Sequence, residues 1–135
     1  MSDGPNPDHL RAYFAVEPPP SGLPPRFGIV TAHNPGSRIA APEDNERADA
    51  ALGLALAAAG LAYFRATGGS RDGSHREPGY GIAAESPEVV RPFSRRFRQE
   101  AFFWVEGGDV FVLDTEGASR HRVAAWAERL TASRP

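Results

Sequence analysis

Apolar and polar residues follow one another along this chain in short segments, and turns rich in glycine, proline and asparagine separate the segments. Apolar residues at every second position, or short apolar runs between turns, are typical of strands, whereas apolar residues three or four positions apart are typical of helices. The segments that fit a strand are residues 26–33, 61–67, 80–84, 102–105 and 110–113. Between the last two strands, residues 106–109 predict a hairpin turn.

Two helices are predicted between these strands. The first spans residues 42–59, because proline and acidic residues occupy its first turn and Gly60 follows its end. Its apolar stripe consists of Ala48, Leu52, Ala55, Leu56 and Ala59. The second helix begins after Ser86, a favourable N-cap, with Pro87 at the first helical position.

The N-terminal 25 residues are expected to lie outside the core, as a flexible segment. Residues 1–8 are expected to be disordered, and residues 17–25 contain five prolines and predict an extended connector. Between them, residues 9–16 predict a short helix. The apolar side of this helix would carry Leu10, Tyr13 and Phe14.

The C-terminal segment, residues 118–135, predicts a third helix. Its apolar residues, Val123, Trp126 and Leu130, follow a helical spacing, so it would cover the sheet or dock a second copy of the chain. An exposed sheet edge is the other surface through which a homodimer is expected to form.

The core is assigned to residues 26–117. Its elements follow the order strand, helix, strand, strand, helix, strand, which predicts an α+β, ferredoxin-like split βαβ sandwich. The added hairpin strand and the flanking helices extend this sandwich. A chain of 135 residues is long enough to bury the core of one such domain.

Composition limits the chemistry that this domain can perform. The absence of cysteine excludes disulfides, thiolate nucleophiles and zinc–thiolate sites. The absence of lysine excludes Schiff-base catalysis. All fifteen basic residues are arginine, and this bias, together with abundant alanine, is typical of a GC-rich bacterial genome.

Charge and hydropathy indicate where the protein acts. A formal net charge of −2 disfavours a general binder of nucleic acid or of membrane surfaces. The sequence shows neither a membrane span nor a signal peptide, so we expect a soluble cytoplasmic protein.

The first candidate site is the polar turn that follows the first strand. Thr31, Asn34 and Ser37 lie at this turn, next to the start of a helix, where side chains and free N–H groups bind polar ligands or anions. Asn45 lies on the apolar stripe of that helix, and a buried amide needs hydrogen-bond partners, which the turn can supply. Alternatively, these side chains only bond the local backbone.

The second candidate site is the loop that contains His75 and Glu77. A histidine close to a carboxylate is suited to general acid–base catalysis, with Asn34 as an oxyanion-type donor. A solvated polar loop is the alternative. Gln99, the only glutamine, is expected to contact the polar turn and support the pocket. No histidine spacing supports a metal site, and we predict neither a metal nor a cofactor.

A third group of residues, Arg91, Arg95 and Arg98, shares one face of the second helix. Such a face either contacts phosphate or is a solvated surface paired with acidic groups. The acidic balance of the chain favours the second interpretation.

Several short motifs together resemble the bacterial family called domain of unknown function 3293. They are residues 10–13, the segment 31–37, Asn45, Asp72-Gly73-Ser74 with Glu77, and residues 96–101. The likeness covers roughly residues 9–114. The family has no established activity, so the resemblance implies no reaction, but it indicates the same polar residues: Asn34, Ser37, Asn45, Glu77 and Gln99.

Three functions remain open at this stage. The first is binding of a polar small molecule, or of a polar group of a partner, by Asn34, Ser37 and Asn45, with Glu77 accepting from a donor. The second is an enzyme with Glu77 or His75 as general base. The third is an interaction module without chemistry.

Overall fold

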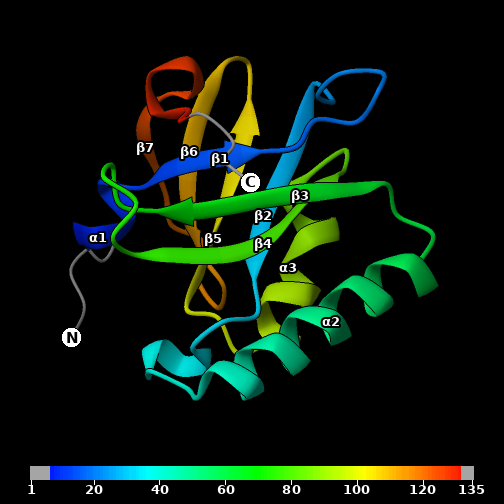
Figure 1. Ribbon diagram of the computed structural model, residues 1–135. Helices are drawn as coiled ribbons and strands as arrows, with labels where there is room; N and C mark the ends of the chain where they lie inside the picture. The colour runs from blue at the N-terminus through cyan, green and yellow to red at the C-terminus, as the bar shows by residue number, and fades with distance from the viewer. Residues whose placement is uncertain (1–6, 132–135) are drawn as a thin grey trace.

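A computed structural model describes residues 7–131, in which seven strands form one antiparallel sheet. The strand order is β1-β3-β4-β2-β5-β6-β7 (Figure 1). The strands are β1 (Tyr13–Val16), β2 (Arg26–Thr31), β3 (Tyr63–Gly69), β4 (Arg76–Ala83), β5 (Ala101–Glu106), β6 (Asp109–Asp114) and β7 (Arg120–Ala125).

Two long helices, α2 (Pro42–Ala58) and α3 (Pro87–Arg96), connect strands that are not neighbours in the sheet. Helix α2 connects β2 to β3, with β4 between them, and α3 connects β4 to β5, with β2 between them. The predicted α+β class is therefore confirmed. The sheet has seven strands and curls strongly, and the ferredoxin-like sandwich as such is not confirmed.

Three shorter helical segments complete the fold: α1 (Pro7–Leu10), η1 (Pro35–Ser37) and η2 (Trp126–Arg129). Within residues 7–131, no helix combines the length and apolar character that crossing a membrane requires.

Each face of the sheet has its own apolar core, because side chains alternate between the two faces of a strand. On the convex face, Leu52 and Leu56 of α2 and Val90 of α3 pack against Ile82 and Trp104 of the strands. Helix α3 lies so close to β2 that a Cβ at Gly28 would be 2.7 Å from Val90 Cγ1, so only glycine fits there.

The second core fills the inside of the curl. In Figure 1, β1, β3 and β4 cross in front of β5, β6 and β7, so that the sheet wraps around this core. Its aromatic centre comprises Phe14, Phe27, Phe64 and Trp126. The segment after η2 lies along the edge strand β1, because Phe14 bridges to Leu130, and the Thr131 N–H donates to the Phe14 carbonyl at 2.8 Å.

The predicted strands and the two long helices between them are all present. Residues 42–58 form α2 and Gly60 follows it with φ of +72°. The hairpin between β5 and β6 turns at Gly107 and Gly108, both with positive φ. Strand β4 is longer than expected, since it begins at Arg76 rather than at Tyr80.

The prediction of a short helix over residues 9–16 is wrong for the second half of that segment. Residues 13–16 form β1, which pairs with β3. Phe14 is completely buried inside the curl, whereas Leu10 is 36% exposed, so the two do not share an apolar face. Strand pairing and burial outweigh a helical spacing in so short a segment. The predicted disorder of residues 1–8 falls largely outside the described residues.

The prediction of a C-terminal helix is also wrong. Residues 120–125 form β7, which pairs with β6, and of the residues after it that the structure describes, 126–131, only the single turn η2 is helical. The spacings of three and four residues between Val123, Trp126 and Leu130 fit a helix. As a strand, however, this segment gives β6 a hydrogen-bonded partner, and Trp126 is buried in the inner core. A helix that docks a second copy is therefore not available in this part of the chain.

The difference between strand and helix at the N-terminal segment can be measured. We expect Phe14→Ala to lower the free energy of unfolding by about 3–5 kcal/mol, because a fully buried ring is removed from a packed core. Leu10→Ala, the matched control, should change it by less than about 0.5 kcal/mol. Urea denaturation of both variants measures this, and equal losses would support one apolar helical face instead.

Candidate functional site

A pocket of about 780 Å³ opens at one end of the inner face of the sheet. This volume is within the range of about 300–1,000 Å³ that is typical of small-molecule sites. The pocket is bounded by the beginning of β1 with α1, by the ends of β2 and β3, by the beginnings of β4 and β5, and by the turn after β2.

The pocket exists because small residues occupy the inner face at this end. Ala66 and Gly68 of β3 lie on the same face as the buried ring of Phe64, and Gly79 lies on the same face of β4 as Glu77. At the other end of the curl, aromatic side chains fill the space. Glycine and alanine leave it open, so the sheet has a filled end and a hollow end.

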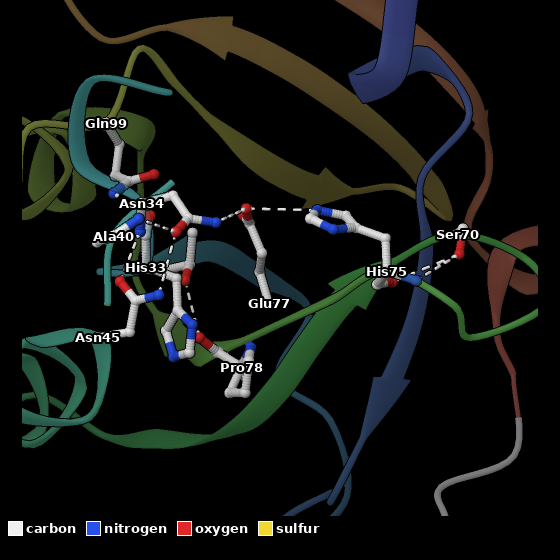
Figure 2. Close-up of polar contacts among 10 residues, drawn as sticks. His33, Asn34, Ala40, Asn45, Ser70, His75, Glu77, Pro78 and Gln99 are labelled. Carbon is white, nitrogen blue, oxygen red and sulfur yellow. Dashed lines mark hydrogen bonds and ion pairs between the residues drawn. The ribbon is translucent and has the colours of Figure 1, made fainter. Parts of the chain in front are cut away.

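The turn after β2 forms the polar wall of the pocket, and Asn34 is its centre. Asn34 adopts the left-handed conformation (φ 49°, ψ 59°), which asparagine tolerates better than most residues. Its N–H donates to Asn45 Oδ1 at 2.9 Å, and Asn45 Nδ2 donates to Asn34 Oδ1 at 3.0 Å (Figure 2). The Ala40 N–H donates to the same Asn34 oxygen at 3.0 Å.

Asn45 therefore has the role that its place on the apolar stripe predicts. It is only 9% exposed, and its amide group pairs with the turn rather than with solvent. The two asparagines lock the turn onto α2. Because both amides are occupied in this way, they hold the pocket wall in place, through two bonds to backbone N–H groups and two bonds between side chains.

Glu77 connects the turn to the hollow of the sheet. Asn34 Nδ2 donates to Glu77 Oε2 at 3.1 Å, and His75 Nε2 lies 3.4 Å from the same oxygen (Figure 2). Within residues 7–131, both contacts use Oε2, and neither involves Oε1. The side chain of Glu77 is 29% exposed and that of His75 is 66% exposed.

The hairpin turn before β4 fixes the position of His75. Ser70 Oγ donates to Asp72 Oδ1 at 2.9 Å and accepts from the His75 N–H at 3.0 Å. The Ser74 N–H and hydroxyl also donate to Asp72 Oδ1. These hydrogen bonds, those from Ser74 first, stabilise the carboxylate form and lower the pKa of Asp72 to about 2.

The other predicted residues support the wall in different ways. Thr31 Oγ1 donates to the Pro78 carbonyl at 2.8 Å and so joins the end of β2 to β4. Gln99 Nε2 donates to the carbonyls of His33 and Phe97, each at 3.1 Å, as the predicted contact with the turn requires. Ser37 lines the exposed rim of the pocket.

The structure therefore brings together Asn34, Asn45, Glu77 and Gln99 with His75, which come from four separate stretches of the chain. The oxyanion-type role of Asn34 stays a prediction: its Nδ2 carries two N–H groups, and one of them donates to Glu77 Oε2. Among the described residues, no group of three or more histidine or acidic side chains is arranged to hold a metal ion.

The arginine face of α3 is occupied by contacts within the protein. Arg91 pairs with Glu88 and also donates to the Thr115 carbonyl, and Arg95 pairs with Glu116. Arg98 is not part of a continuous face, because it lies after the end of α3 with φ of 60°. These pairings agree with a solvated, charge-paired surface.

Sequence reasoning missed two side chains of the pocket, His9 and Phe103. They meet edge to face, with ring centroids 5.8 Å apart. Burial has the largest effect on the pKa of His9 and lowers it. The carboxylates of Glu77 and Glu100 have the opposite effect and raise it. The period of two in β5 could have placed Phe103 on the inner face, but only the curl brings His9 beside it.

Comparison with known proteins gives one match. The family described as "Protein of unknown function (DUF3293)" matches residues 30–102, which is more than half of the 135-residue chain. The matched region includes the turn after β2, Asn45, Glu77 and Gln99. Neither the curated proteins nor the solved structures contain a match.

The bond between the two asparagines can be tested by removing one amide. We expect Asn45→Ala to lower the free energy of unfolding by about 1–3 kcal/mol, because the Asn34 N–H loses its acceptor in a part-buried site. Glu46→Ala, at the next and exposed position of α2, should change it by less than about 0.5 kcal/mol. Chemical denaturation compares them, and similar losses would show that the amide pair contributes nothing.

Proposed function

This chain belongs to the DUF3293 family, and from that premise we propose that it binds a polar small molecule in the pocket beside the turn after β2. The observation that carries the proposal is the hollow of about 780 Å³ with a part-exposed carboxylate, Glu77, at one wall. A cavity with apolar walls and a few convergent polar groups is the usual form of a ligand site.

The polar residues have two different roles in this proposal. Asn34 and Asn45 bond each other, and Thr31 and Gln99 bond backbone carbonyls, so these four side chains make the wall rigid. A rigid wall lowers the entropy cost of binding. Glu77 Oε1 then accepts a hydrogen bond from the ligand, and the hydroxyl of Ser37 adds a polar group at the rim.

The test is a thermal-shift screen of polar metabolites against the wild-type protein and a variant with a blocked pocket. Gly68→Leu places a side chain in the hollow, since a Cβ there meets only the Phe14 ring, at 3.7 Å. We expect compounds that stabilise the wild-type protein to lose this effect in Gly68→Leu.

The matched control is Thr67→Leu, one position earlier in β3, where the side chain points to the other face of the sheet. It should respond to the same compounds as the wild-type protein. A screen in which no compound raises the melting temperature, or in which Gly68→Leu responds equally, would contradict binding in this pocket.

A second candidate function is an enzyme, with Glu77 or His75 as the general base. The contact of 3.4 Å between His75 Nε2 and Glu77 Oε2, at the wall of the pocket, favours it. A carboxylate and an imidazole at this distance can exchange and orient a proton during a reaction.

The enzyme hypothesis predicts that Glu77→Gln folds normally but is inactive. The carbonyl oxygen of the introduced amide would still accept from Asn34 Nδ2, whereas the carboxylate base would be lost. Metabolite profiles of a deletion strain, complemented with wild type or with Glu77→Gln, measure this. We expect a compound to accumulate in the deletion strain and with the variant; identical profiles in all strains would contradict catalysis.

A further inference from the structure

Glu77 differs from many carboxylates of this protein in its partners. About half of the acidic side chains among the described residues pair with arginine, and the pairs include Asp49 with Arg65, Glu88 with Arg91, Glu116 with Arg95, and Asp109 with Arg122. Within residues 7–131, Glu77 has no arginine partner. Its neighbours are the neutral amide of Asn34 and the imidazole of His75.

The arginines that line the pocket are engaged away from Glu77. Arg129 donates to the carbonyls of Leu10 and Ala12, and Arg11 pairs with Asp8. Arg71 lies over the ring of Tyr13, with its guanidinium carbon 6.0 Å from the ring centroid. The cationic groups therefore lie toward β1 and the rim, and the carboxylate is not neutralised by them.

The effect of charge on His9 agrees with this picture. Burial has the largest effect on the pKa of His9 and lowers it, whereas the charged groups that act on it are all carboxylates and raise it. Glu77 comes first among them, followed by Glu100, Asp8 and Asp114. These carboxylates therefore favour a positive charge at His9. A cation that entered the pocket would be attracted to this region.

The pocket also has apolar walls, and one of their residues, Gly68, pairs with Glu77 across β3 and β4. Ile29, Ala66, Gly68 and the ring of Phe103 form these walls. Small residues on β3 allow a flat or slender apolar group to lie against the backbone there, and the ring of Phe103 on β5 lines the same pocket.

We propose that the pocket selects compounds that carry a protonated amine on an apolar body, with the ammonium group bound to Oε1 of Glu77 and the body between β3 and Phe103. This inference rests on the proposed binding function and adds the charge of the ligand. A hydrogen bond between an ammonium group and a carboxylate is stronger than one between neutral groups, so charge decides the selection.

The experiment uses three probes of the same ring and similar chain length: 2-phenylethylamine, 2-phenylethanol and 3-phenylpropionate. Their dissociation constants are measured with the wild-type protein by NMR titration at neutral pH and low salt. We expect the amine to bind about tenfold more tightly than the alcohol, and the carboxylate to bind most weakly.

Two variants separate Glu77 from the general negative charge of the pocket. In Glu77→Gln, the amine should bind no more tightly than the alcohol, whereas Glu100→Gln, at the exposed rim, should keep most of the preference. If Glu77→Gln does not fold, the wild-type protein still tests the proposal, because the preference for the amine must fall as salt is raised from about 20 to about 500 mM.

The outcomes distinguish this inference from the binding function itself. Equal binding of amine and alcohol, or tightest binding of the carboxylate, would overturn the charge selection even where the metabolite screen finds ligands for the pocket. Failure of all three probes to bind at millimolar concentration would overturn it as well. A metabolite screen in which no compound stabilises the wild-type protein would overturn the binding function, and the charge selection with it.

Discussion

The alternation of side chains on a curled sheet is the constraint on which the rest of this structure depends. A curled sheet has an inner face, and every second residue of every strand points into it. At one end this face carries Phe27 and Phe64, with Trp126 from η2, and it is filled. At the other end it carries Ala66 and glycines, and the space that they leave is the pocket.

The amide pair between Asn34 and Asn45 fixes the wall of that pocket. It joins a turn in a left-handed backbone conformation to the first turn of α2, so that Asn34 can also reach Glu77 on β4. One asparagine thus holds a helix, a turn and a strand in a single arrangement. This use of polar groups is structural, and the Glu77 side chain stays 29% exposed beside it.

Membership of the DUF3293 family and the geometry of the pocket contribute different kinds of information. The family match covers the turn, the helix and the two strands that carry the polar network, but its description assigns no activity. The proposed chemistry therefore depends on Glu77. This carboxylate is partly exposed, has no arginine partner among the described residues, and lies at the wall of the pocket. Binding of a donor group explains this arrangement most directly, and acid–base catalysis would use the same atoms.

The sequence alone determined the local elements. Proline and acidic residues define the start of α2, Gly60 defines its end, and the position of Asn45 on an apolar stripe predicts its buried amide pair. Tertiary structure decided what local signals leave ambiguous. Phe14 and Trp126 fit a helical spacing, yet the pairing of β1 with β3 and of β7 with β6 buries them in one core, because the hydrogen bonds of a strand are made with another strand and not within its own residues. For the same reason, only the curl brings His9 and Phe103 to the pocket beside Glu77.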